Sequence, residues 1–363
     1  MKRLVFTVTN DLTFDQRMIR ICTSLANAGY HVLLVGRKMK DSIPLKKMAF
    51  DQRRLHCFFS RGKLFYAEYN LRLLFFLLFK KFDLICAIDL DTIIPCLWVS
   101  AIRRKKRVYD AHELFCEMKE IVQRPAIYRI WKNIEKKTVP SFDFGYTVNE
   151  PIAEEFRKMY HRDYGVIMNA PVLRPLAIPE KKEKYILYQG AVNEGRSFET
   201  LIPAMKEVNA KLIIAGDGNL MNQTRKLVKE CGLESKVSFV GKVEPFELLK
   251  YTFGAYIGVT LFENKGLSNY FSLANRFFDY FHSGVPQLCV DYPVYRELNK
   301  TRPVALLTTD LSSKNIAHQL NLLLENDVLY KELQQNCLHQ REILNWQNEE
   351  KKLLAFYRTY LSE

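Results

Sequence analysis

The sequence predicts an α/β protein with two doubly wound domains, each a parallel sheet flanked by helices. Short apolar and β-branched runs alternate with segments of helical periodicity in the first half of the chain, and the pattern restarts in the second half. Such alternation is typical of parallel strands joined by crossover helices. A chain of 363 residues also exceeds the size at which a single hydrophobic core keeps growing.

The first domain is expected over residues 1–170. Its strands are predicted at LVFTVT, HVLLVG, FDLICAI and RVYDAH, with helices through QRMIRICTSLANAG, from Thr92, and ending near Lys137. Residues 163–184 contain three prolines and little periodicity, which favours an interdomain linker.

The second domain is expected over residues 171–345. Strands are predicted at YILYQG, AKLIIAG, VSFVG, AYIGVT and PQLCVD, and helices at 198–208, 219–231, 245–252, 273–283 and 314–325. A last helix within 346–363 is expected to pack back on the first domain. Two Rossmann-like domains joined by a linker are expected to face a central cleft between the carboxyl ends of their strands. Open α/β sheets bind ligands at these strand ends.

The formal charge of +14 is concentrated in the first half of the chain. Residues 1–170 hold 30 Lys and Arg against 18 Asp and Glu, whereas residues 171–363 hold 24 against 22. A basic surface of this kind attracts nucleic acid, anionic lipid or a phosphorylated substrate. The run RRKKR at 103–107 lacks interleaved aromatic residues and precedes a core strand, so we interpret it as a solvated loop and expect no nucleic-acid partner.

Cysteine usage and hydropathy indicate a cytoplasmic protein. The eight cysteines form no C-x-x-C motif and several fall in apolar strands, as expected of reduced thiols. The longest apolar run in the most hydrophobic region, Leu73 to Phe79, is far shorter than the roughly 20 residues that span a bilayer. Residues 64–82 leave two interpretations open: a core crossover helix, or a segment lying peripherally on the inner face of the membrane.

A carboxylate among aromatic rings marks the candidate site. In FSLANRFFDYFHSGVPQL (271–288), a helix is predicted to stop at Gly284 and Pro286. Asn275 and Arg276 precede Asp279 by four and three residues, which places the three side chains on adjoining parts of one face. The helix N-terminus and Arg276 favour a phosphate, and Asp279 can accept hydrogen bonds from sugar hydroxyls. Alternatively, Asn275 only caps the helix and Asp279 pairs with Arg276 at the surface.

The segment NYFSLANRFFDYFHSGVP resembles the donor segment of one branch of the retaining GT-B glycosyltransferases often called family 4. YQGAVNEGRSFETLI, LIIAGDGN and VSFVGKV resemble, in order, further segments of the donor domain, and DQRMIRICTSLANAGYHVLLVG, DLDTIIP and RVYDAHELF resemble the N-terminal domain. The resemblance covers nearly the whole chain. It implies the GT-B fold, with an acceptor-binding first domain and a donor-binding second domain.

By this resemblance, Asp279 holds the donor ribose, and Arg196 and Arg276 neutralise the diphosphate. The remaining donor-binding residues implied are Gly190, Gly218, Val243, Asn269, Tyr270 and Asn275. The glutamate of the wider family eight positions before the ribose carboxylate is replaced here by Phe271. The substitution changes how the hydroxyls of the donor sugar are held.

His112 and Glu113 follow a predicted strand of the first domain, and the resemblance implies that they contact the transferred sugar or the acceptor. Together with Arg196 they are the catalytic candidates, since retaining GT-B enzymes resemble one another in lacking an obvious protein nucleophile. A packing or helix-capping role for His112 is the alternative. Asp89-Leu90-Asp91 has the form of a metal-binding D-x-D, but it ends a strand of the first domain, so we interpret it as acceptor-side or structural. No required metal or cofactor is expected.

These observations predict a retaining glycosyltransferase that moves a sugar from a UDP- or GDP-sugar to a glycan or lipid-linked acceptor in cell-surface polysaccharide synthesis. An anionic membrane surface is a further candidate partner through the basic first domain. The alternatives are a nucleotide-sugar 2-epimerase of the same fold and a non-catalytic membrane-associated binding protein. A dinucleotide-binding oxidoreductase is disfavoured, because VFTVTNDLTFDQR after the first strand contains no glycine.

Overall fold

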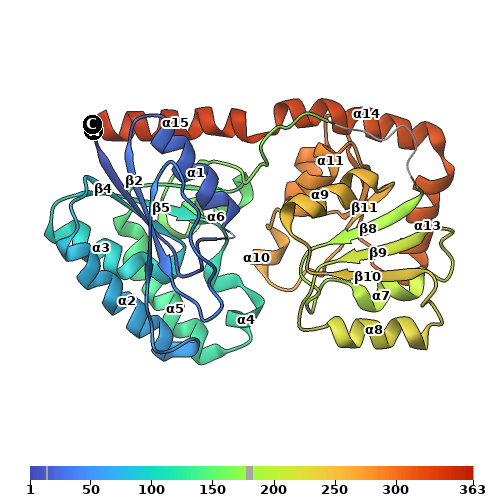
Figure 1. Ribbon diagram of the computed structural model, residues 1–363, viewed down its shortest axis with the longest axis horizontal. Helices are drawn as coiled ribbons and strands as arrows, with labels where there is room; N and C mark the ends of the chain where they lie inside the picture. The colour runs from blue at the N-terminus through green and yellow to red at the C-terminus, as the bar shows by residue number, and fades with distance from the viewer. Residues whose placement is uncertain (14, 177–182, 363) are drawn as a thin grey trace. The chain divides into compact units, whose positions relative to one another are not determined.

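Two parallel sheets organise the chain in the computed structural model, which describes residues 1–13, 15–176 and 183–362 (Figure 1). One compact unit comprises Met1–Asn169, Gly266–Ser268 and Trp346–Glu363. The other comprises Ala170–Lys265 and Asn269–Asn345.

The first unit is built on a seven-stranded sheet of order β3-β2-β1-β4-β5-β6-β7, with every pairing parallel. The strands are β1 (Arg3–Thr7), β2 (His31–Arg37), β3 (Asp51–Leu55), β4 (Leu84–Ile88), β5 (Lys106–Ala111), β6 (Phe144–Thr147) and β7 (Gly165–Val166). Its main helices are α1 (Gln16–Asn27), α2 (Gly62–Phe79), α3 (Ile93–Ile102), α4 (Lys119–Val122), α5 (Pro125–Thr138), α6 (Glu150–Tyr160) and α15 (Trp346–Ser362). The chain turns back at β1 and β4, which are neighbours, so the topological switch point lies between them.

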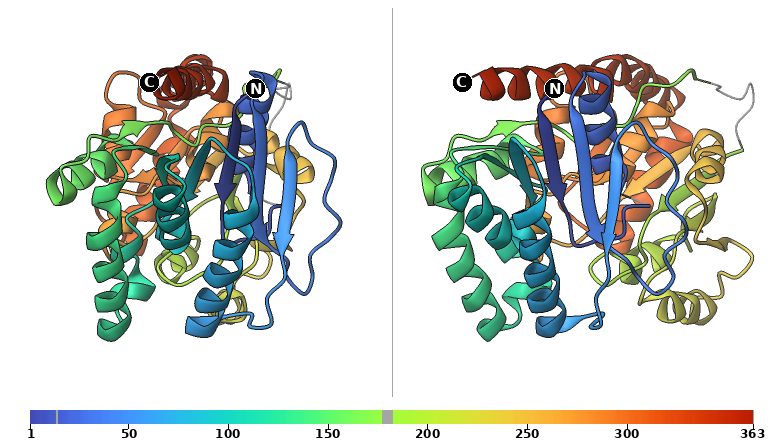
Figure 2. Two further views of the ribbon diagram at one scale, coloured as in Figure 1. Left: turned by 90° about the vertical axis from the view of Figure 1, so that its left-hand side faces the viewer. Right: turned by 60° about the vertical axis from the view of Figure 1, so that its left-hand side comes forward.

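Alternate residues of the central strands point to opposite faces of this sheet, and each face is covered by helices. Leu4, Phe6 and Cys86 face α1 and α15 in one hydrophobic core, which also contains Trp346 and Tyr357. Helices α2 and α3 pack side by side on the opposite face (Figures 1 and 2). Burial on both faces explains why these strands read as nearly continuous apolar runs.

The second unit contains a six-stranded parallel sheet of order β10-β9-β8-β11-β12-β13. The strands are β8 (Tyr185–Gln189), β9 (Lys211–Ala215), β10 (Val237–Gly241), β11 (Ile257–Thr260), β12 (Gln287–Val290) and β13 (Ala305–Thr308). Its helices are α7 (Phe198–Ala204), α8 (Met221–Glu230), α9 (Pro245–Gly254), α10 (Leu267–Tyr270), which begins within the first unit, α11 (Asn275–His282), α12 (Pro293–Asn299), α13 (Ser313–Glu325) and α14 (Asp327–Ile343). Here the switch point lies between β8 and β11.

The helices of the second unit also divide between the two faces of its sheet. Helix α11 packs on α9, α14 and β11, whereas α7 contacts α8 and α13, and Figure 1 shows these two groups on opposite sides of the strands. Helix α11 is held to the sheet by Tyr280, whose hydroxyl donates to Leu187 O at 2.8 Å and accepts from Gln189 N at 3.1 Å. This anchoring fixes the position of the residues one turn earlier in the helix.

The predicted fold class is confirmed, with differences in single elements. The predicted helix at 273–283 begins at Asn275 and ends at His282, and the helix at 198–208 already ends at Ala204. Strands β3, β6 and β13 and helices α6 and α14 were not predicted. Part of the predicted linker, residues 177–182, lies outside the described residues, and a short strand, β7, occupies its first part.

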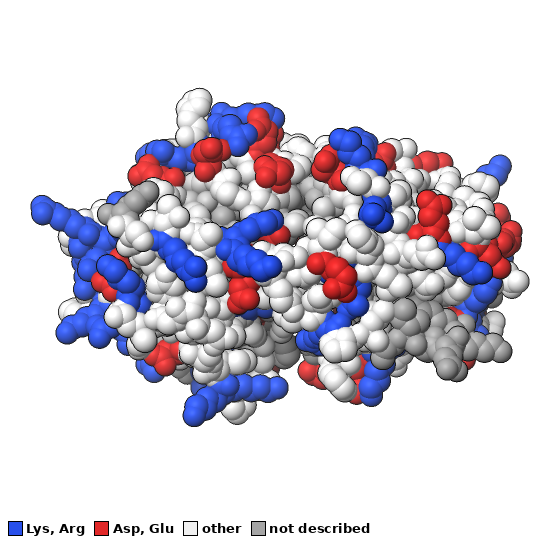
Figure 3. Space-filling view, turned by 90° about the horizontal axis from the view of Figure 1, so that it is seen from above, with Lys and Arg blue, Asp and Glu red and all other residues white. Residues whose placement is uncertain are grey.

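Among the described residues, none of the helices combines the length and the hydropathy needed to cross a bilayer. All eight cysteines are free thiols, six of them buried. Cationic and anionic side chains are interspersed on the surface of each unit in the view of Figure 3.

Candidate functional site

The first cluster of polar side chains lies at the carboxyl edge of the first sheet, beside the switch point. Strand β4 ends at Ile88 and is followed by Asp89, while β5 ends at Ala111 and is followed by His112. These two strands are neighbours, so the residues after them converge.

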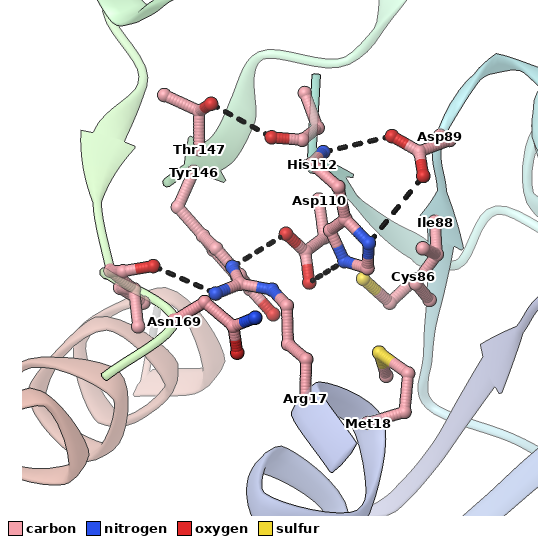
Figure 4. A network of polar contacts seen from close by, with 12 residues as sticks. Arg17, Met18, Cys86, Ile88, Asp89, Asp110, His112, Tyr146, Thr147 and Asn169 are labelled. Carbon is pink, nitrogen blue, oxygen red and sulfur yellow. Dashed lines mark hydrogen bonds and ion pairs between the residues drawn. The ribbon is translucent and has the colours of Figure 1, made fainter. Parts of the chain in front are cut away.

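His112 lies between two carboxylates (Figure 4). Its Nε2 is 3.2 Å from Asp110 Oδ2 and its Nδ1 is 3.5 Å from Asp89 Oδ2, while its backbone N–H donates to Asp89 Oδ1 at 2.8 Å. Asp110 is fully buried and also accepts a 2.9 Å hydrogen bond from Arg17 Nη2. A second nitrogen of Arg17 donates to Ile167 O at 2.9 Å. The result is an alternating series of charges: Arg17, Asp110, His112 and Asp89.

The charges of this network shift the pKa values of its members. Burial lowers the pKa of His112, but Asp110 and Asp89 outweigh it and raise the pKa to about 9. Burial raises the pKa of Asp89 to about 7 and that of Asp91 to about 6. Burial also acts on Asp110, yet Arg17 and His112 hold its pKa below the ordinary value. At neutral pH the His112 ring is therefore an imidazolium, with each ring nitrogen within 3.5 Å of a carboxyl oxygen.

Asp89 adopts a backbone conformation that is unusual for a residue with a side chain. Its φ is 52° and its ψ is −179°, a region populated almost only by glycine. In this conformation the Asp89 carboxylate accepts the hydrogen bond from the His112 backbone N–H. Strained residues of this kind cluster at functional sites.

The second cluster lies at the carboxyl edge of the second sheet, where glycines allow two turns to meet. A Cβ added to Gly216 would lie 1.8 Å from Gly190 O, and a Cβ added to Gly218 would lie 2.4 Å from Val192 O. Gly190 N donates to Ala215 O at 2.9 Å, and Val192 N donates to Asp217 O at 3.1 Å. Only glycine at 216 and 218 allows the loop after β8 to lie this close to the loop after β9.

Arg276 approaches this loop from the first turn of α11. Its guanidinium lies over the Tyr188 ring, with Cζ 4.9 Å from the ring centroid, and a Cβ added to Gly190 would lie 3.2 Å from its Nη1. The residue is only 8% exposed, and within the described parts of the chain Nε and Nη2 have no hydrogen-bond partner. A buried cation whose donors are unpaired is costly, and an anion at the Gly190 loop would satisfy it.

Asp279 lies one turn further along α11 and is partly exposed. Its Oδ2 accepts a 2.8 Å hydrogen bond from Gln189 Nε2, and Gln189 Oε1 accepts one of 2.8 Å from Thr252. Gln189 is the last residue of β8, so the sheet itself orients the carboxylate. The surface ion pair between Asp279 and Arg276 is not the arrangement found, because Arg276 is buried on Tyr188. Nor does Asn275 cap the helix, since Ala274 is the N-cap residue.

The other predicted donor residues are distributed around the same edge of the second sheet. Arg196 lies in the loop before α7, with Cζ 5.6 Å from the Phe262 ring centroid. Val243 follows β10 and packs against the core beneath α11, and Tyr270 packs on Tyr292 with ring centroids 5.2 Å apart. Asn269 donates to Lys265 O at 3.4 Å, at the start of the segment that leads into α11.

Comparison with known proteins adds a family match for the second unit. Residues 174–340 match the family model described as "Glycosyl transferases group 1". An uncharacterized glycosyltransferase of Methanocaldococcus jannaschii is 28% identical over 165 residues, which cover 45% of this chain and 33% of that protein. The family match lies almost entirely within the second unit, and the chain spans about a third of the length of this relative.

Solved structures match both units together. Sucrose-phosphate synthase from Thermosynechococcus elongatus gives a TM-score of 0.81 at 18% identity, covering 100% of each chain. Anabaena HepE in complex with UDP and glucose gives 0.77 at 12% identity, covering 99% of this chain and 100% of that one. The fold is GT-B. A putative UDP-N-acetylglucosamine 2-epimerase from Listeria monocytogenes is also similar, with a TM-score of 0.66 at 11% identity over 99% of this chain and 96% of that one.

In this fold the predicted site residues lie in two groups, one in each unit. His112 and Glu113 follow β5 in the first unit, and Gly190, Gly218, Arg276 and Asp279 gather around the β8 and β9 ends in the second. Five further residues were missed: Arg17, Asp110, Gln189, Thr252 and Ser197. Ser197, which follows Arg196, has a left-handed φ of 58° and a buried hydroxyl that lacks a hydrogen-bond partner among the described residues.

One sequence signal could have identified Asp110: it is a charged residue inside the predicted strand RVYDAH. Asp89 and Asp91 belong to the first cluster, with Asp91 accepting a hydrogen bond from Thr9.

In the described ranges, no group of three or more His, Cys, Asp or Glu side chains is arranged to hold a metal ion. Independence from metal stays a prediction.

Proposed function

We propose that this GT-B protein is a retaining glycosyltransferase of the family 4 type. It transfers a hexosyl group from a nucleotide diphosphate sugar to a glycan or lipid-linked acceptor in cell-surface polysaccharide synthesis, on the cytoplasmic side of the membrane. The second unit binds the donor and the first unit binds the acceptor. A UDP-sugar is the first donor to test, because HepE, of the same fold, is described in complex with UDP and with UDP-glucose.

Arg276 is the observation that carries the donor site. Its buried guanidinium has two nitrogens without a hydrogen-bond partner among the described residues and lies beside the Gly190 loop. The N-terminus of α11 adds the positive end of the helix dipole, which favours an anion. A diphosphate bound there would complete the hydrogen bonding of Arg276, and Arg196 would add a second cation.

Asp279 is proposed to hold the ribose of the same nucleotide. Two vicinal hydroxyls match the two oxygens of a carboxylate, and Gln189 restrains its orientation. In catalysis, positioning of the reactants and stabilisation of the departing diphosphate would supply the acceleration. His112, Asp89 and Glu113 would orient the acceptor and the transferred sugar in the first unit.

The test is a calorimetric titration of UDP, and of GDP and ADP in parallel, into wild type and Arg276→Met. We expect the variant to bind the preferred nucleotide at least tenfold more weakly, which corresponds to about 1.4 kcal/mol. The ligand-free variant should melt at or above the wild-type temperature, because it loses a buried, incompletely paired charge. Arg296→Met is the matched control, since Arg296 is exposed and pairs with Asp291. A destabilised Arg276→Met protein with unchanged affinity would make Arg276 structural and remove the proposed phosphate site.

A nucleotide-sugar 2-epimerase is the second candidate, favoured by the likeness to the Listeria monocytogenes structure. Both activities use the same donor pocket, so nucleotide binding does not separate them. Incubation of the bound nucleotide sugar without any acceptor does. Inversion at the sugar C2 would favour the epimerase, whereas stability of the sugar until an acceptor is added would favour the transferase.

A further inference from the structure

Helix α2 is apolar on two opposite sides. Phe65, Tyr69, Leu73 and Leu77 form a buried stripe, spaced four residues apart. The outward stripe has the same spacing and is apolar as well: Leu71 is 55% exposed, Phe75 54% and Phe79 87%. A helix on the surface of a soluble domain normally presents polar residues outward. Singly exposed apolar residues are common, but a continuous stripe along a helix is not.

Neighbouring elements extend this stripe. Helix α3 packs beside α2 and exposes Trp98 and Ile102. The loop before α2 exposes Phe58, which is 89% accessible. We call this set the α2–α3 surface: Phe58, Leu71, Phe75, Phe79, Trp98 and Ile102. The two helices that carry most of this surface are labelled in Figure 1.

The exposed Phe58 ring is held in place by its surroundings. The Glu68 carboxylate accepts 2.9 Å hydrogen bonds from the backbone N–H groups of Phe58 and Phe59. Arg72 donates to Glu68 at 2.8 Å and lies over the Phe58 ring, with Cζ 5.0 Å from the centroid. The ring is therefore presented to solvent by a fixed backbone.

Cations surround the α2–α3 surface. Residues 58–81 and 98–105 contain eight Lys and Arg and a single acidic residue, Glu68, whose charge Arg72 balances. At the end of α2, beyond Phe79, a hollow of about 390 Å³ opens between the chain terminus and the end of α3. Four cationic side chains line it: Arg3, Lys81, Arg103 and Lys105. Asp83, also in the lining, accepts from the Arg3 backbone N–H and pairs with Lys105.

We infer that the α2–α3 surface docks on an anionic phospholipid bilayer, with its aromatic rings and aliphatic side chains in the interface and its cations against headgroup phosphates. Interfacial helices bury Trp, Phe and Leu side chains at this depth, and the indole N–H of Trp can remain in contact with water there. The cations that surround the α2–α3 surface favour lipid over a second copy of the chain, because a symmetric dimer would bring these like charges together. Helix α2 would lie in the interface, since no described helix can span a bilayer.

The experiment is co-sedimentation of the full chain with vesicles of phosphatidylcholine alone or containing 30% phosphatidylglycerol, at low and high salt. We expect binding only to the anionic vesicles, weakened by salt. Lys80→Gln with Lys81→Gln should weaken binding about 25-fold, at roughly fivefold per cation. Phe75→Gln with Phe79→Gln should weaken it at least tenfold. Both residues are exposed, so the variants should melt as wild type does.

The matched control is Phe246→Gln with Val328→Gln, two exposed apolar residues of the second unit, which should bind vesicles as wild type does. Wild type that stays in the supernatant at low salt would overturn the inference. So would unchanged binding by the Phe75/Phe79 variant, or a dimer in light scattering that this variant converts to a monomer. Nucleotide titration of the same variants keeps the test separate from the donor site, because loss of vesicle binding with intact nucleotide affinity concerns this surface alone.

Discussion

Removal of the Asp110 charge should lower the pKa of His112 and release the ring from its cationic state. In wild type the pKa of His112 is raised to about 9 by Asp110 and Asp89, against the effect of burial. Two unit charges 3.2 Å apart interact by about 5 kcal/mol at an effective dielectric constant of 20. That energy corresponds to roughly 4 pKa units as an upper bound. In Asp110→Asn we therefore expect the pKa of His112 to fall below about 7.

The same pKa shift predicts a pH dependence of stability. The folded-state pKa of His112 lies above its unfolded value of 6.5, so the stabilisation is fully present below pH 6.5 and is lost as the pH rises through 9. The difference of roughly 2.5 units corresponds to about 3 kcal/mol. Asp110→Asn should lose this contribution and also leave the buried Arg17 without its carboxylate, a cost of about 3–5 kcal/mol.

The assay is an NMR titration of the histidine ring resonances between pH 5 and 10. The titration measures the protonation of the His112 ring directly. A stability measurement would instead have to assume that the two units unfold in one step. Asp143→Asn is the matched control, since Asp143 is exposed and pairs with Arg162 in the same unit. A wild-type pKa near 6.5, or a folded Asp110→Asn protein whose His112 still titrates near 9, would refute the assigned charges.

Three further variants test the packing around the two sites. Gly216→Ala should destabilise the second unit by about 1–3 kcal/mol or more, because the added methyl would overlap Gly190 O. Thermal unfolding measures this. Gly232→Ala is the comparison for backbone strain alone, since Gly232 has a φ of 67° but open space around its Cβ position, and it should cost less than Gly216→Ala. Trp346→Ala should destabilise the first unit by about 3–5 kcal/mol, because a buried ring that donates to Ser24 is lost; a change below 1 kcal/mol in denaturant unfolding would argue against a structural role for α15. Gln189→Leu should remove the hydrogen bond from Thr252 and the 2.8 Å hydrogen bond that restrains Asp279, and calorimetry should find at least a fivefold loss of nucleotide affinity.

Regular features of the fold were predictable from the sequence, because buried parallel strands read as apolar runs. LVFTVT, FDLICAI and YILYQG became β1, β4 and β8. Strand β3 escaped prediction, because its sequence DQRRL is polar and it lies at the edge of the sheet. Helix α14 contains many polar residues, and its burial depends on α11 and α13, which pack on it.

The candidate site was predictable where its residues are close in sequence. Asn275, Arg276 and Asp279 could be placed on one helix, and Gly190 and Gly218 at strand ends. The partners that set their chemistry could not be placed, because they come from distant segments: Arg17 is 93 residues from Asp110, and Gln189 is 90 residues from Asp279. Local spacing also gives no sign that Arg276 turns inward onto Tyr188, which depends on the packing of α11 against β8.

The most direct measurement for the central claim is a calorimetric titration of UDP, GDP and ADP into wild type and Asp279→Ala, with Glu297→Ala as an exposed control in the same unit. We predict that one nucleotide binds wild type and the control equally, and binds Asp279→Ala at least tenfold more weakly while all three proteins melt alike. Binding of none of these nucleotides to wild type, or equal binding to Asp279→Ala, would contradict a nucleotide-sugar site at the carboxyl edge of the second sheet.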